Sequence, residues 1–410
     1  MTKNKKITIA LPTSTFLPNI GGVEVGLHNI AKNLKLLNIK VVVICSTKHY
    51  KSLKKKNICL PYNIETYPRF IGRLLKFNPY IAQLYINKCF NNLQKKYSFD
   101  IWHCTSGFPM GVLVSSYIKK NNIPGILRTV GSDIQKDESI GYGSRLNPKI
   151  DYMVKKSLFL FNKLVATTPT IEEEYKKIGI KNNKLLKITN GVDVNRFFLR
   201  NTNVSEIRNN LNIDNDEYVF ICVGRNHIKK GFKYLIKSSL KLIDNSNKKF
   251  KVIFVGKNVN DLKKNIKDQS LYKYFIFIEP SNIDEDSSSD FSLPHNYIID
   301  LYKSSNAFIL PSLVESFGIV LIEAMASGLP IITTDSPGCR DIVKHGKNGI
   351  LVEKGNSDKL YLAMHDYMHG KYNINQYIEY NLKDVLKYDY KNIVNKYSRA
   401  YNKILYKKDE

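Results

Sequence analysis

Residues 311–330 read PSLVESFGIVLIEAMASGLP and follow the apolar run 307–310, which predicts a strand. Good helix formers fill residues 318–327, Gly328 suits a C-terminal cap, and Pro330 prevents the helix from continuing. A strand, a turn and a helix in this order are typical of an open α/β sheet, in which ligands bind beyond the carboxyl ends of the strands. We therefore expect a ligand site at this turn.

The start of this predicted helix offers a seat for phosphate groups. Near Ser316, Phe317 and Gly318 the backbone amides lack partners within the helix, and the positive end of the helix dipole lies there. Glu323 follows Gly318 by five residues, which is about 7 to 8 Å along the axis at about 1.5 Å per residue. A diphosphate at the helix start would therefore leave a ribose beside Glu323 and a sugar beside Glu315 in the turn.

A plainer interpretation of each glutamate competes with this one. Glu315 can be a surface turn residue, and Glu323 can be a solvated helix position. The neighbours Leu321, Ile322 and Ala324 are apolar, which argues against a solvated face at this point of the helix.

Strand-like and helix-like segments alternate along the rest of the chain. The polar stretch 193–216 lacks a strand and marks a domain boundary, so the pattern predicts two parallel, doubly wound sheets, each the size of a Rossmann-like domain. The short β-branched runs that carry this prediction are 7–11, 40–45, 99–103, 126–130, 164–167 and 185–189, then 218–223, 250–255, 274–278, 307–310, 330–333 and 349–352.

Length and composition fit this arrangement. The 410 residues, 43% of them hydrophobic, exceed what one core usually holds and predict two domains. The run 7–11 is too short for a signal peptide and ends at Pro12, and the apolar stretch 316–334 contains Glu323, so we expect neither a leader nor a membrane span. The six cysteines show no metal-ligand spacing, which is typical of a reduced, cytoplasmic protein.

A second charged group follows another predicted strand. Residues 223–231 read VGRNHIKKG, so Gly224 permits a close backbone approach, and Arg225 and Lys230 share one strand-to-helix turn with Lys229. Two cations at such a turn would neutralise the charge on a departing diphosphate. A basic turn in a lysine-rich chain is also often a solvated loop, but its position after a strand favours the binding role.

Three features of the first half also carry candidate residues. Gly21 and Gly22 lie between the first strand and a helix, where paired glycines either bring backbone amides to a phosphate or form a plain turn. The turn 128–135 reads RTVGSDIQ and contains Gly131 and Asp133. His103 ends the preceding strand; a histidine there is more often structural, although it is the side chain most readily used in proton transfer.

Together these stretches resemble the group 1 (family 4-like) retaining glycosyltransferases. The E-x7-E spacing of Glu315 and Glu323 is intact, and the G-R-x4-K-G pattern fits Arg225 and Lys230. The resemblance implies catalytic roles for Glu315, which would contact the donor sugar, and for the two cations. It also implies that Glu323 contacts the ribose and that the other donor-binding residues are Gly21, Gly22, Gly224, Ser316, Phe317 and Gly318.

One turn departs from the family pattern. Residues 129–134 resemble the motif T-x-H-G-x-D-I, but Val130 occupies the place of the histidine. The resemblance leaves Gly131 and Asp133 as candidates on the acceptor side, with His103 as a substitute imidazole. The absence of this histidine would either change the contacts with the donor sugar or lower the activity.

The resemblance implies a GT-B fold, an α/β arrangement of two Rossmann-like doubly wound parallel-sheet domains facing a cleft. We assign residues 1–195 to an acceptor-side domain, 196–380 to a nucleotide-sugar domain and 381–410 to a C-terminal helix that packs back on the first domain. The implied enzyme is a hexosyltransferase that moves a sugar from a nucleoside-diphosphate sugar to a glycan or lipid-linked acceptor with retention, in polysaccharide or glycolipid biosynthesis. The alternatives are a nucleotide-sugar 2-epimerase and a catalytically weakened sugar-nucleotide-binding protein.

The acidic motifs and the net charge of the chain predict which cofactors and partners it uses. The triplets at 214–216 and 284–286 lie in solvated stretches, so we expect no metal and no cofactor besides the donor substrate. A net charge of +27 favours anionic partners, and we expect no nucleic acid among them. Residues 48–96 hold eleven Lys or Arg and one acidic residue, with aromatic residues interleaved. They form either a surface for an anionic membrane, at its cytoplasmic face, or an ordinary basic helix face.

Overall fold

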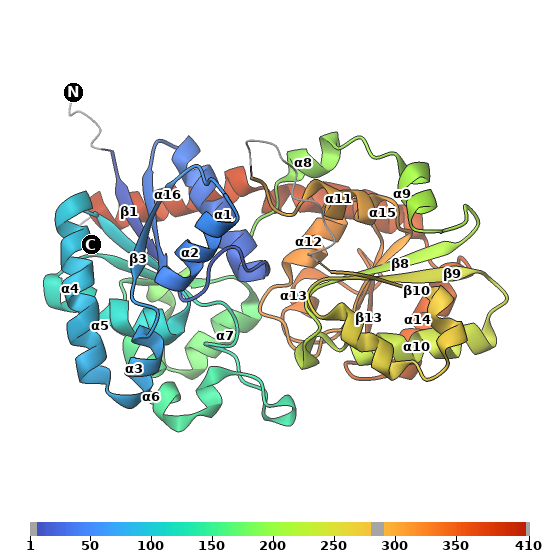
Figure 1. Ribbon diagram of the computed structural model, residues 1–410, viewed down its shortest axis with the longest axis horizontal. Helices are drawn as coiled ribbons and strands as arrows, with labels where there is room; N and C mark the ends of the chain where they lie inside the picture. The colour runs from blue at the N-terminus through green and yellow to red at the C-terminus, as the bar shows by residue number, and fades with distance from the viewer. Residues whose placement is uncertain (1–5, 280–290, 407–410) are drawn as a thin grey trace. The chain divides into compact units, whose positions relative to one another are not determined.

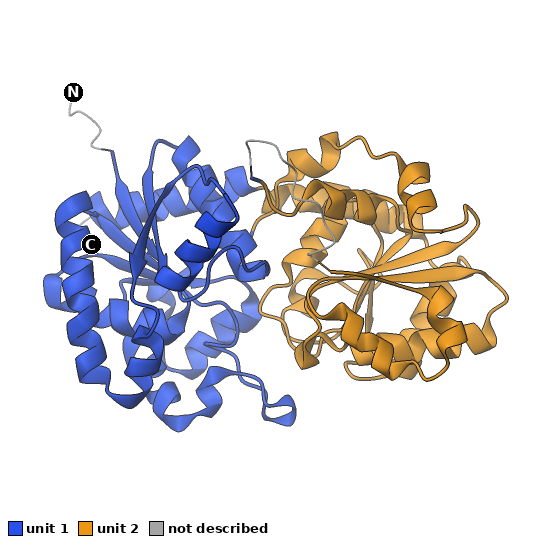
Figure 2. Ribbon diagram, in the orientation of Figure 1, with its two compact units in different colours: residues 1–190, 288–291, 390–410 blue, residues 191–287, 292–389 orange. Residues whose placement is uncertain are grey.

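The computed structural model describes residues 6–279 and 291–406, which form two compact units (Figure 2). Unit 1 comprises residues 6–190, 291 and 390–406, and unit 2 comprises residues 191–279 and 292–389. Within the described residues the chain thus passes between the units after Asn190, after Phe291 and after Asp389. Residues 381–389, which we expected in the returning C-terminal helix, belong to unit 2.

Unit 1 is built on a seven-stranded parallel sheet in the order β3-β2-β1-β4-β5-β6-β7 (Figure 1). Strands β1 and β4 are buried throughout, as expected for parallel strands covered on both faces. The strands are β1 (Thr8–Pro12), β2 (Lys40–Ser46), β3 (Asn63–Tyr67), β4 (Ile101–Thr105), β5 (Gly125–Arg128), β6 (Lys163–Ala166) and β7 (Leu185–Lys187). The α-helices are α1 (Gly22–Leu36), α2 (Thr47–Lys55), α3 (Ile71–Phe77), α4 (Pro79–Tyr97), α5 (Val112–Asn121), α6 (Pro148–Leu158), α7 (Pro169–Lys177) and α16 (Tyr390–Tyr406).

Unit 2 is built on a six-stranded parallel sheet in the order β10-β9-β8-β11-β12-β13. The strands are β8 (Tyr218–Val223), β9 (Phe250–Val255), β10 (Phe275–Ile278), β11 (Ala307–Leu310), β12 (Ile331–Thr334) and β13 (Ile350–Val352). The α-helices are α8 (Val194–Leu199), α9 (Val204–Asn210), α10 (Phe232–Asn245), α11 (Asn296–Lys303), α12 (Ile319–Ala326), α13 (Cys339–Ile342), α14 (Ser357–Met368) and α15 (Ile374–Asp384). The two parallel sheets confirm the predicted α/β fold class.

One strand was not predicted from the sequence. Strand β3 was missed, because it pairs only with β2 at the sheet edge and reads NIETY, without an apolar run. The second acidic triplet, at 284–286, lies outside the described residues. No helix among the described residues is long and apolar enough to cross a bilayer.

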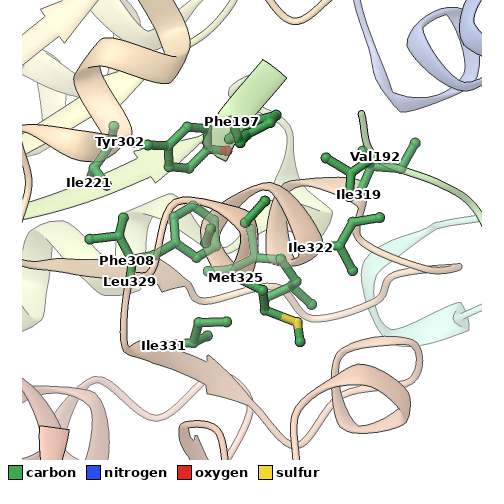
Figure 3. Close-up of a cluster of buried hydrophobic side chains, with 14 of the residues drawn as sticks. Val192, Phe197, Ile221, Tyr302, Phe308, Ile319, Ile322, Met325, Leu329 and Ile331 are labelled. Carbon is green, nitrogen blue, oxygen red and sulfur yellow. The ribbon is translucent and has the colours of Figure 1, made fainter. Parts of the chain in front are cut away.

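Helix α12 lies in the main apolar core of unit 2 (Figure 3). Its residues Ile319, Ile322 and Met325 are buried in the same cluster as Phe308 of β11 and Ile331 of β12. The helix is one residue shorter at each end than predicted, because the backbone at Gly318 has φ 81° and Ser327 forms the C-cap. The core therefore fixes the helix beside the strand ends of unit 2.

Candidate functional site

Three turns interlock at the carboxyl ends of the neighbouring strands β8, β11 and β12. The amide of Leu313 donates to the carbonyl of Lys229 at 2.7 Å, which ties the turn after β11 to the turn after β8. The backbone at Gly231 has φ 65°, and a Cβ there would lie 2.0 Å from the carbonyl oxygen of Pro311. Only glycine fits this position, so the glycine of the basic motif permits the two turns to touch.

The turn after β12 is fixed in the same way. The amide of Glu315 donates to the carbonyl of Pro337 at 2.9 Å. The backbone at Gly338 has φ 81°, and a Cβ there would lie 2.4 Å from the carbonyl oxygen of Glu315. Glu315 is thereby tied to the turn after β12, and only glycine fits at position 338.

The interlocked turns bring Glu315 and Lys230 together. The Nζ atom of Lys230 lies 2.6 Å from Oε1 of Glu315, and the Nζ atom of Lys229 lies 3.6 Å from Oε2. The hydroxyl of Ser312 donates to Oε1 at 3.2 Å. Glu315 is 5% exposed, which excludes the interpretation as a surface turn residue. In the sequence, Lys229 was named only as a neighbour of Lys230 and Ser312 was not named, although both lie inside the matching motifs.

The electrostatics of this cluster favour an anionic ligand. Burial raises the pKa of Glu315, but Lys229 and Lys230 outweigh it and lower the pKa to about 2. The carboxylate is therefore ionised at neutral pH. Two ammonium groups face one carboxylate, and their side chains remain 18% and 14% exposed. The surplus positive charge suits the phosphates of a nucleotide.

The other cation of the motif lies apart from this cluster. Arg225 is exposed, and it forms no ion pair within residues 6–279 and 291–406. A Cβ on Gly224, whose φ is 152°, would lie 3.3 Å from Cε of Lys230. Gly224 therefore leaves room for the Lys230 side chain, a role that is separate from any contact with a ligand.

The three residues before α12 that were predicted to bind the donor lie in different environments. Ser316 is half-buried and Gly318 is the N-cap of the helix. Phe317 is 1% exposed, and its ring packs edge-on against Tyr388 with centroids 5.9 Å apart. Its side chain belongs to the core, so the predicted donor contact of Phe317 can come only from its backbone.

Glu323 is a buried acid on α12, with 5% of its surface exposed, so it is not a solvated helix position. The hydroxyl of Tyr302 on α11 donates to its Oε2 at 3.0 Å. Burial raises the pKa of Glu323 to about 7, although Tyr302 and Arg196 oppose the rise. No motif pointed to Tyr302, because it lies on another helix, 21 residues away.

In unit 1 the paired glycines lie at the start of α1. Gly21 is the N-cap with an extended backbone of φ −165°, and Gly22 begins the helix. The buried Glu24 accepts a hydrogen bond from Thr15, and its Oε2 lies 3.0 Å from where a Cβ of Gly21 would be. A carboxylate of the protein itself thus lies beside the positive end of the helix dipole, where a phosphate was expected.

Asp133 organises the turn after β5. Its carboxylate accepts from the amides of Val130 at 2.9 Å, Gly131 at 3.0 Å and Gly107. It is 2% exposed, and burial raises its pKa despite these amides. Gly131 has φ 117°, which makes this tight turn possible. Backbone amides already occupy the carboxylate of Asp133, and its acceptor-side role stays a prediction.

The burial and the contacts of His103 are those of a structural residue. It is 1% exposed, its Nδ1 lies 2.7 Å from the hydroxyl of Tyr401, and its ring lies 4.9 Å from that of Tyr397 on α16. Burial and the nearby Arg128 lower its pKa to about 3. A neutral imidazole under a helix favours the structural alternative over the role of a substitute catalytic histidine.

The described residues contain no group of three or more His, Cys, Asp or Glu side chains that could hold a metal ion. The first acidic triplet lies within this part of the chain, and its Asp214 and Asp216 pair instead with the exposed Lys249. The cluster around Glu315 offers two ammonium groups, those of Lys229 and Lys230, to an anionic ligand.

Comparisons with known proteins agree with this geometry. Residues 20–196 match the family described as Glycosyltransferase Family 4, and residues 203–384 match Glycosyl transferases group 1. An uncharacterized glycosyltransferase of Methanocaldococcus jannaschii is 28% identical over 58% of this chain and 59% of its own length. The alpha-monoglucosyldiacylglycerol synthase of Acholeplasma laidlawii is 24% identical over 84% and 85%.

A solved structure shares the fold. The Anabaena protein HepE, in complex with UDP and glucose, aligns with a TM-score of 0.75 at 17% identity, over 96% of this chain and 99% of its own. The two family matches divide the chain near the boundary between units 1 and 2, and the second contains the whole Glu315 cluster. The chain therefore belongs to the group 1 glycosyltransferases and has the GT-B fold.

Proposed function

We propose that the turns after β8, β11 and β12 bind a nucleoside-diphosphate sugar, and that the enzyme transfers its sugar with retention to a glycan or lipid-linked acceptor. The observation that carries the proposal is the buried Glu315, paired with Lys230 and Lys229 beside the start of α12. The lysines would hold the diphosphate, Glu315 would accept hydrogen bonds from the sugar, and Glu323 would accept them from the ribose hydroxyls.

The lysines also fit the demands of the transfer step. The bond between the anomeric carbon and the diphosphate oxygen breaks, and the acceptor oxygen bonds to that carbon. The acceptor proton passes to the departing diphosphate oxygen, and Lys230 stabilises the charge that develops on the diphosphate. The relatives support the substrate classes by name, since one makes a glucosyl lipid and another binds UDP and glucose.

The test is to incubate the protein with UDP-, GDP- and ADP-sugars, with and without glycan and polyprenyl-phosphate acceptors, and to measure the released nucleoside diphosphate. We expect release that depends on an acceptor and a product whose anomeric configuration, determined by NMR, matches that of the donor. An inverted product would contradict retention. Interconversion of donors without any acceptor would support the 2-epimerase alternative, and donor binding without turnover would support a weakened enzyme that lacks the histidine replaced by Val130.

A further inference from the structure

Helix α4 has two apolar faces, and the protein core accounts for only one of them. Ala82, Ile86 and Phe90 are fully buried against the sheet of unit 1, and Leu93 continues this face. On the opposite side of the helix, Ile81, Leu84 and Tyr85 are 40%, 51% and 56% exposed. Residues spaced by three and four positions share one face, so these three side chains form a stripe.

Helix α3 extends this stripe. The helices α3 and α4 lie side by side and are joined at Asn78 (Figure 1). Phe77 and Tyr80, on either side of that joint, are 83% and 73% exposed. Phe70, at the start of α3, is 46% exposed and packs edge-on against Tyr85 with ring centroids 5.9 Å apart. We call these six side chains the α3–α4 patch: Phe70, Phe77, Tyr80, Ile81, Leu84 and Tyr85.

The charged residues on the segment that carries the patch have one sign. Residues 66–99 contain no Asp or Glu and six Lys or Arg. Arg69, Arg73 and Lys76 of the α3 region and Lys88 of α4 are all exposed. The nearest acid before this stretch, Glu65, is engaged by Lys96 and Tyr97 at the far end of α4. Aromatic side chains ringed by cations are typical of surfaces that bind the headgroup region of an anionic bilayer.

We propose that the α3–α4 patch docks the enzyme on an anionic lipid bilayer, with the six apolar side chains entering the interface and the four cations contacting the headgroups. The patch lies at the α3–α4 joint, so the lysine-rich helix α2 and the end of α4, which expose no large apolar side chain, contribute only long-range attraction. The proposal stands apart from the proposed transfer reaction, because it needs neither donor nor acceptor.

The first experiment measures sedimentation of the full chain with vesicles of phosphatidylcholine alone and with 30% phosphatidylglycerol, without any nucleotide sugar. We expect binding to the anionic vesicles and a loss of at least tenfold in the variant Phe77→Ser, Tyr80→Ser, Leu84→Ser. The matched control changes equally exposed apolar residues elsewhere, Leu36→Ser, Tyr152→Ser and Leu199→Ser, which are 74%, 57% and 82% exposed. The control should bind like the wild type.

A charge series tests the second component of the proposal. Arg69→Gln, Arg73→Gln and Lys76→Gln should each weaken binding by about fivefold at low salt, which is the effect expected of one cation at an anionic surface. The control Lys237→Gln, Lys267→Gln and Lys359→Gln removes the same net charge from exposed positions of unit 2. If both sets weaken binding equally, the effect is that of net charge, and the patch is not the docking surface.

A fluorescent reporter keeps the test valid if the serine variant fails to fold. The sequence has one tryptophan, and Trp102 is fully buried, so Phe77→Trp adds an exposed reporter. Its emission should shift to the blue on anionic vesicles, whereas that of Tyr406→Trp should not. No shift at position 77, no binding of the wild type to anionic vesicles, or binding to an RNA duplex in place of vesicles would each overturn the proposal.

Discussion

In unit 2 two lysines at a strand end pair with a buried glutamate and stay partly exposed, whereas in unit 1 the polar side chains at the strand ends are buried against the protein itself. Lys230 and Lys229 face Glu315 in the first case. Asp133 is held by backbone amides and His103 by Tyr401 in the second. The same type of sheet thus leaves cationic side chains partly open to solvent in one unit and uses polar side chains for internal order in the other.

The largest effect is expected from a substitution that disrupts the Glu315 cluster of unit 2. Lys230→Gln should lower kcat by about 10²- to 10³-fold, because it removes a donor aimed at the charge that develops on the diphosphate. The measurement is the initial rate of nucleoside diphosphate release at saturating donor. Lys237→Gln, on the exposed side of α10, is the control and should keep the wild-type rate. A kcat within threefold of the wild type would remove Lys230 from the catalytic step.

The buried acid of α12 should leave a signature in the pH dependence of stability. The folded protein keeps the Glu323 proton up to a pKa of about 7, while the unfolded chain loses it near 4.5. The free energy of unfolding should therefore fall between these pH values, by about 3 kcal/mol for this group. Urea titrations from pH 4.5 to 7.5 measure the fall. Glu323→Gln should flatten it, and an equal slope in both proteins would contradict the burial of an ionisable Glu323.

Substitutions at the strand ends of unit 1 should lower the free energy of unfolding and leave the transfer rate largely unchanged. Asp133→Ala leaves up to three backbone amides without their acceptor and should cost about 2 kcal/mol of unfolding free energy. Asp133→Asn keeps one side-chain oxygen and should cost less. Chemical denaturation measures both changes. The folded Asp133→Asn variant should keep most of its transfer rate, and a hundredfold loss of rate at wild-type stability would show that Asp133 contacts a substrate after all.

The smallest effect concerns His103. His103→Phe keeps a ring under α16 and loses the hydrogen bond to Tyr401, so it should cost about 1 kcal/mol of stability. The transfer rate should stay within about threefold of the wild type, whereas removal of a general acid or base usually costs 10²- to 10⁴-fold. Parallel measurements of melting temperature and initial rate distinguish the two roles.

The fold could be predicted from the sequence because the parallel strands are buried on both faces and leave continuous apolar runs. Strand β3 was not predicted, because this edge strand contains Asn63 and Glu65 and has no continuous apolar run. The sequence motifs predicted Glu315 and Lys230 at two strand ends, and the structure shows that these strands, β11 and β8, are neighbours. The glycine positions of these motifs have a physical reason, shown by the close approach of Gly231 to Pro311.

The partners of the buried groups could not be predicted. Tyr302 reaches Glu323 from another helix, and Tyr401 reaches His103 from a segment 298 residues away. Such contacts depend on packing that no local pattern encodes. The same holds for Phe317, whose neighbours in the sequence point to a ligand while its ring fills the core.

The central claim is that the Glu315 cluster of unit 2 holds the diphosphate of the donor. The most direct test is calorimetric titration of UDP, GDP and ADP into the wild type and into Lys230→Gln, with Lys237→Gln as the control. The account predicts that at least one nucleotide binds the wild type and the control alike and binds Lys230→Gln at least tenfold more weakly. Equal affinity in all three proteins, or no binding of any nucleoside diphosphate to the folded wild type, would contradict it.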